Sequence, residues 1–107
     1  MALKRYWYHI LVALSESPCH GAEIQRRVEE HSEGTITLYP AMLYGSLEDL
    51  AHKGLIRAVK PPTAESNLRS RHYALSSAGR ITLAEETSRL EGLLRVARRG
   101  LRRGSKA

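Results

Sequence analysis

The sequence predicts a mainly helical α+β fold, and three patterns support that prediction. Apolar residues near the start recur at the three- and four-residue spacing of one helix face, at Trp7, Ile10, Leu11 and Leu14. Two later segments, 55–59 and 71–75, show the alternation typical of strands. A last apolar stripe extends to residue 101, which is farther than a domain of 107 residues needs. We therefore expect helices, a small sheet and one long final helix.

The first two helices are expected over residues 3–15 and from about 20 to 32. Ser17-Pro18 breaks the first helix, because proline cannot continue the backbone hydrogen bonding. In the second helix Ile24 and Val28 face inward, and Glu33-Gly34 ends it. The short β-branched segment "TITL" at 35–38 is expected to form a brief strand.

A third helix is expected to begin at Pro40, where the missing N–H of proline costs nothing. Its inward stripe is Leu43, Leu47 and Leu50, and Gly54 follows its end. At 100° per residue the opposite face carries small, acidic and imidazole side chains, namely Ala41, Gly45, Glu48 and His52. Tyr44 and Asp49 lie on the flanks, so this face is the first candidate for contact with a partner.

The chain then forms a long hairpin and the final helix. The segments "LIRAV" (55–59) and "RHYAL" (71–75) flank a loop rich in Pro, Ser, Asn and Thr. A serine caps the last helix, which we expect to run from residue 77 to about 100. This order is that of a winged helix-turn-helix with a two- or three-stranded wing. We expect a winged domain at 1–76, a dimerisation helix at 77–101 and a basic disordered tail at 102–107.

The net charge of +6 is concentrated at one end of the chain. Six of the 17 basic residues lie in 95–107, where no acid occurs, which leaves 11 basic residues to balance 11 acids in 1–94. The basic end is suited either to contact with DNA or to solubility, and the sequence does not separate these roles. The rest of the domain is neutral, so global charge alone does not predict a DNA-binding protein.

Other function classes find little support. A single cysteine excludes an internal disulfide and fits a reducing compartment, which favours a cytoplasmic protein. Cys19 at a helix start suits a semi-buried thiol or, less well, a redox site. The five histidines lack metal-site spacing, and we expect no metal or cofactor. No catalytic motif occurs, so we expect no enzyme.

Three stretches resemble the PadR family of bacterial transcriptional regulators, in its short form with a single C-terminal helix. They are "ILVALSESPCHGAEI" (10–24), "LYPAMLYGSLEDLAHKGLI" (38–56) and "SRHYALSSAGR" (70–80). Two departures lie in the third helix. Ala41-Met42 stands where the family has Gly-Thr, and Glu48-Asp49 stands where it often has a basic residue. The resemblance implies a homodimeric DNA-binding regulator that represses its targets and is released by a small aromatic or hydrophobic effector.

The predicted DNA-binding residues come from the third helix and the hairpin. They are Pro40, Ala41, Met42, Tyr44, Gly45, Glu48, Lys60, Arg69, Arg71 and His72. The plainer interpretation is a solvated helix face with Tyr44 packed on the sheet, and a loop that is basic without function. Arg26 and Arg27 suit phosphate contacts or ordinary pairing with Glu29 and Glu30.

The predicted dimer interface follows the stripe of the last helix together with one aromatic residue of the first. It comprises Trp7, Leu83, Leu90, Leu94, Ala97 and Leu101. The predicted effector pocket comprises Tyr6, Trp7 and Tyr8, although core and dimer packing also explain these residues. The expected partners are double-stranded DNA with a palindromic operator, a second copy of the chain and an aromatic effector. The rival function is a winged-helix protein-interaction module, which the acids Glu48 and Asp49 favour.

Overall fold

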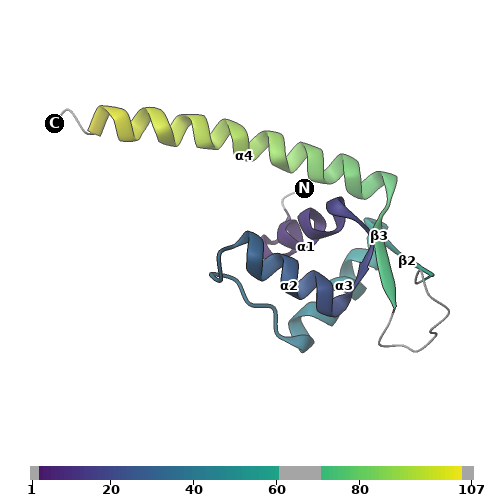
Figure 1. Ribbon diagram of the computed structural model, residues 1–107. Coiled ribbons are helices and arrows are strands. Elements are labelled where there is room, and N and C mark those ends of the chain that lie inside the picture. The colour runs from purple at the N-terminus through teal and green to yellow at the C-terminus, as the bar shows by residue number, and fades with distance from the viewer. Residues whose placement is uncertain (1–2, 61–70, 105–107) are drawn as a thin grey trace.

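The computed structural model describes residues 3–60 and 71–104. Within these ranges the chain forms four helices and three short strands (Figure 1). In chain order they are α1 (Arg5–Glu16), β1 (Cys19–His20), α2 (Gly21–His31), α3 (Pro40–His52), β2 (Ile56–Val59), β3 (His72–Leu75) and α4 (Ser77–Gly104). This is the mainly helical fold with a small sheet that the sequence predicts.

The first three helices enclose one core. Its fully buried side chains come from the predicted helical stripes and include Ile10, Leu11, Ile24, Leu43 and Leu50. Trp7 belongs to the same core, because only 7% of it is exposed, and Lys4 Nζ lies 4.9 Å from its ring centroid. These contacts fix α3 against the body of the domain and leave its opposite face outside.

The sheet corrects one prediction. Residues 35–38 form no strand: Ile36 N donates to Ser32 Oγ at 3.0 Å, and the loop buries Ile36 and Leu38 in the core. The alternation in "TITL" therefore reflects two inward side chains in a loop. The third strand is instead β1, whose residues Cys19 and His20 pair antiparallel with β3, so the described sheet has the order β1-β3-β2.

Helix α4 starts as predicted and ends later. Gly79 N donates to Ser76 Oγ at 2.9 Å, so a serine caps this helix. The helix continues through Gly104, so the first three residues of the expected disordered tail are helical. With 28 residues it is about 42 Å long, and Figure 1 shows its C-terminal half extending beyond α1. No helix in the described ranges has the length and apolar character needed to cross a membrane.

Candidate nucleic-acid interface

The outer face of α3 is open from its first residue. Pro40 and Ala41 are exposed, as are Met42 and Tyr44, and the N-cap residue Tyr39 makes no side-chain capping hydrogen bond to the first turn. The N–H groups at this helix start therefore keep no side-chain acceptor within the described structure, and such groups bind phosphate well. A Cβ on Gly45 would meet no described atom within 4 Å, so a partner's backbone can approach closely there.

Tyr44 makes a contact that sequence analysis missed. Its hydroxyl oxygen lies 3.0 Å from the position that a Cβ on Gly21 would occupy. The ring thus packs over the first residue of α2, rather than on the sheet, while 51% of Tyr44 stays exposed. Gly21 and Tyr44 belong to two of the quoted sequence stretches, and the close approach explains why a glycine follows His20. A half-exposed phenol at a helix N-terminus is suited to donate a hydrogen bond to phosphate.

A groove of about 540 Å³ separates α3 from the hairpin. Glu48 and His52 line it from the helix side, and Arg71 and Tyr73 line it from the hairpin side. Lys60 and Arg71 are exposed at the two ends of the segment 61–70. The predicted contact Arg69 lies outside the described residues. The structure therefore places an acid of α3 and a base of the hairpin along one groove.

His72 follows Arg71 at the start of β3, and its side chain lies on the side of the hairpin away from the groove. Its ring is 5.4 Å from that of His20, in an edge-to-face arrangement, and the two residues pair across β1 and β3. His20 Nδ1 accepts a hydrogen bond from Glu23 N at 3.1 Å, which caps α2. His72 is half-buried, so it supports the start of α2 and is a weaker candidate for DNA contact than Arg71.

The two arginines of α2 are held by acids and carbonyls. Arg26 bonds both Glu23 and Glu30, with an Nε–Oε1 distance of 2.7 Å to Glu23. Arg27 reaches the carbonyls of Ala13 and Ser17 at 2.9 Å and so ties α2 to the end of α1. The hydrogen bond from Arg26 lowers the pKa of Glu23 to about 2. The expected pairing is confirmed for Arg26 with Glu30, its second partner is Glu23 in place of Glu29, and Arg27 is a structural residue.

Cys19 does not have the surroundings of a reactive thiol. Only 4% of it is exposed, and burial raises the pKa of its thiol, which opposes thiolate formation. Cys19 lies in β1, where it is paired with Tyr73 of β3. In the part of the chain that the structure describes, no three His, Cys, Asp or Glu side chains are grouped to hold a metal ion.

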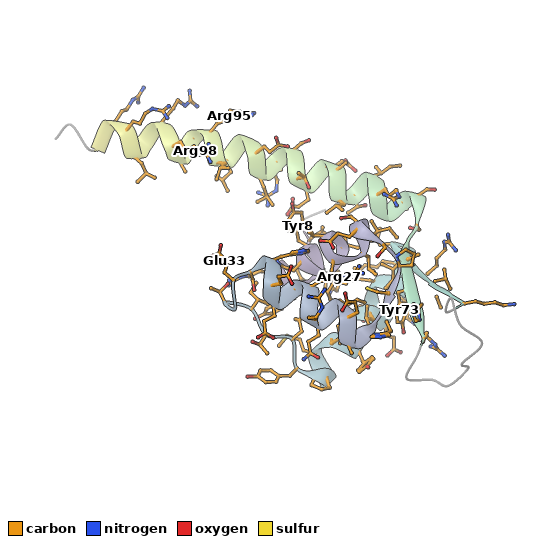
Figure 2. All side chains as sticks on the ribbon, in the orientation of Figure 1. Tyr8, Arg27, Glu33, Tyr73, Arg95 and Arg98 are labelled. Atoms are coloured by element: carbon orange, nitrogen blue, oxygen red, sulfur yellow. The ribbon has the colours of Figure 1, made fainter. Side chains whose placement is uncertain are left out.

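The stripe of α4 divides into two halves. Leu83 packs against the core, and the hydroxyls of Tyr8 and Thr87 lie 3.0 Å apart, so the first half binds α1 of its own chain (Figure 2). Farther along, Leu94 and Leu101 are 51% and 74% exposed. Leu93 and Val96 are also exposed, and the predicted interface omitted both. The second half therefore offers an apolar surface to another molecule.

The three aromatic residues of the predicted effector pocket differ in burial and in hydrogen bonding. Trp7 is buried in the core, and the hydroxyl of Tyr8 is bonded to Thr87. Tyr6 remains 36% exposed. An effector at this place would meet Tyr6 directly and would reach Tyr8 only by opening the contact between α1 and α4.

Among comparisons with known proteins, a family model identifies the family, and solved structures share the fold. The model of the transcriptional regulator PadR-like family matches residues 10–85. RosR from H. salinarum has a TM-score of 0.67 and 28% identity, over 80% of this chain and 72% of that one. A transcriptional regulator from Clostridium thermocellum has a TM-score of 0.71 and 19% identity, over 87% and 89%.

A third solved structure contains DNA. Bacillus subtilis PadR in complex with operator DNA has a TM-score of 0.67 and 20% identity, over 78% of this chain and 47% of that one. Among curated proteins, none matches this sequence significantly. The matched family consists of transcriptional regulators and not of enzymes, which confirms the expectation from the sequence.

Proposed function

Because this chain belongs to the PadR-like family of transcriptional regulators, we propose that it is a homodimeric repressor of the cytoplasm. It binds a palindromic operator with α3 in the major groove and the hairpin beside it. The observation that carries the proposal is the open outer face of α3. Small side chains at Ala41 and Gly45 admit the edges of the bases, while Tyr44 and the free backbone N–H groups of residues 41 and 42 take phosphates.

The apolar half of α4 supports the dimer. Leu94 and Leu101 continue the same helix face that Leu83 uses against the core, and more than half of each is exposed. A second copy can cover them with its own α4 or α1. Two-fold symmetry then places two α3 helices on half-sites about 34 Å apart, so the operator is palindromic.

The contact between α1 and α4 is where we place effector control. Tyr8 lies at this contact and joins the two helices through Thr87, and Tyr6 on the same helix is 36% exposed. A flat aromatic effector that stacks on the ring of Tyr8 would displace α4 relative to α1. Since α4 also joins the protomers in the proposal, the displacement changes the distance between the two α3 helices and releases the operator.

The operator-binding proposal is tested by competition gel shifts with the DNA upstream of its own gene. Wild-type protein should bind one such segment at least about 10³-fold more tightly than random duplex. Gly45→Gln adds a long side chain where the fold has room, so it should keep its helical circular dichroism and bind the operator no more tightly than random duplex. Ala84→Gln adds the same side chain on the exposed part of α4 and should bind as the wild type does.

The rival is a protein-interaction module that binds no specific DNA. The exposed acids Glu48 and Asp49 on α3 are the observation that favours it. Under that function the wild-type protein would show no preference among upstream segments, and Gly45→Gln would leave DNA binding unchanged. Either result would overturn the repressor proposal.

A further inference from the structure

The distal part of α4 carries a dense set of arginines. Arg95, Arg98, Arg99, Arg102 and Arg103 lie within nine consecutive residues, all exposed, and no acid occurs among residues 95–104. Four of them, together with Gly92, line one open depression of about 450 Å³. We call Arg95, Arg98, Arg99 and Arg102 the arginine face. Figure 2 shows Arg95 and Arg98 on the part of α4 that extends beyond the domain.

The arginine face is distinct from the apolar stripe of the same helix. At about 100° per residue its four members fall within an arc of roughly 100°. Leu90, Leu94, Ala97 and Leu101 fall in another arc, centred about 120° farther around the helix. A partner that covers the apolar stripe therefore leaves most of the arginine face open to solvent, with Arg98 nearest to the stripe.

The fold itself gives no reason for the charges of Arg95, Arg98 and Arg99. Among the described residues, no carboxylate lies within salt-bridge distance of Arg95, Arg98 or Arg99, whereas Arg89 nearby is paired with Glu86 at 2.6 Å. Positive charges three and four residues apart on a helix repel one another. Attraction to the helix dipole explains cations only in the last turn, which begins at Leu101. A polyanionic partner would relieve the repulsion.

We propose that the arginine face of α4 binds the phosphate backbone of nucleic acid, without sequence preference, as a surface separate from α3. The charge distribution favours this partner. Residues 1–94 have equal numbers of acidic and basic residues, so the excess charge of the chain lies in its last 13 residues. A winged domain that is neutral overall and carries Glu48 and Asp49 on α3 has little attraction of its own for a polyanion. Neutralised phosphates supply the salt-dependent part of nucleic-acid affinity.

The test is a salt titration with the full chain and a short random-sequence DNA duplex, followed by fluorescence anisotropy between about 50 and 200 mM KCl. The variant Arg95→Gln/Arg98→Gln/Arg99→Gln should reduce the slope of log K against log salt by up to about 0.9 for each lost contact. At 0.1 M salt, relative to 1 M, each lost contact is worth roughly eightfold in affinity.

The matched control is Arg5→Gln/Arg80→Gln/Arg89→Gln, which removes the same charge from exposed sites nearer the domain body. It should keep most of the wild-type slope. An unchanged slope in the α4 variant, or an equal loss in the control, would overturn the proposal. If the α4 variant keeps the wild-type slope but loses binding to an acidic protein or an anionic vesicle, the arginine face belongs to that partner instead, and the proposal is overturned.

A third variant separates charge from helix packing. Arg95→Lys/Arg98→Lys/Arg99→Lys keeps the charges, and it should keep the slope. Loss of binding in this lysine variant together with loss of its helical circular dichroism would mean that the arginines act through the fold, which contradicts the proposal. Operator preference is measured separately. Gly45→Gln should abolish the preference and leave the slope of log K against log salt for random duplex nearly unchanged. A failure of the α3 proposal and a failure of the α4 proposal are therefore distinguishable.

Discussion

Gly79 lies in the first turn of α4, where the helix is docked closely against the turn that follows α3. A Cβ added to Gly79 would lie 2.0 Å from the carbonyl oxygen of Leu55 and 3.2 Å from Leu75 Cδ2. The same Leu55 carbonyl accepts a hydrogen bond from Ser76 N at 3.1 Å. Gly79→Ala must therefore push α4 away from this turn, and the contact is with backbone, which cannot rotate aside.

The expected cost follows from these contacts. Separation of α4 from Leu55 breaks the bond to Ser76 and leaves buried groups unpaired, at about 1–3 kcal/mol. Overpacking against Leu75 adds about 1–3 kcal/mol. The better helix propensity of alanine returns only about 1 kcal/mol. We expect Gly79→Ala to lower the free energy of unfolding by roughly 1–5 kcal/mol, which at the middle of this range corresponds to a Tm lower by on the order of 10 °C.

Urea unfolding followed by circular dichroism measures this cost, with every protein at one protomer concentration because a dimer links stability to concentration. Gly45→Ala is the matched control, since its new Cβ has open space among the described atoms. It should stabilise the chain by about 0.5–1 kcal/mol through helix propensity. A Gly79→Ala protein as stable as the wild type would refute the close docking of α4.

Three further substitutions test the interfaces. Leu94→Glu should give monomers in light scattering, because the half-exposed leucine contributes little to its own domain while a charge in a dimer interface is costly. Arg71→Ala should flatten the salt dependence of binding by up to about one phosphate per protomer, and an unchanged slope would remove the hairpin from the interface. Glu48→Lys should raise affinity for random duplex more than for the operator in competition titrations; equal gains would contradict a role in discrimination.

The sequence predicts the helices well because their stripes are long and regular. The stripe of α3 begins after Pro40 and ends before Gly54, and its inward leucines are the buried ones. Strand β1 was missed because it has two residues, Cys19 and His20, which is too short for any alternation to be visible. Its existence depends on pairing with β3, more than fifty residues later, and no local pattern records such a partner.

The candidate interface is predicted less completely than the helices, because several of its contacts join residues far apart in the sequence. The exposed face of α3 follows from helical geometry alone, but the contact of Tyr44 with Gly21 joins two helices and needs the tertiary fold. The half-buried position of His72 beside His20 likewise depends on the pairing of β1 with β3. The late end of α4 was missed because Gly100 and Gly104 favour termination, whereas the arginines between and before them are good helix formers.

The acids of α3 lower DNA affinity and the arginine face of α4 raises it. The two effects do not cancel, because the first changes the ratio of operator affinity to random-DNA affinity and the second changes both affinities together. Contacts of the arginine face with phosphates raise the affinity for operator and random DNA by the same factor, so they leave the ratio of the two unchanged. Glu48 lies beside the groove between α3 and the hairpin, where its repulsion of phosphate is offset only by contacts that a matching sequence supplies. Under both proposals, affinity resides mainly in α4 and discrimination mainly in α3. Salt then changes how much DNA the protein occupies more strongly than it changes which sequence the protein selects.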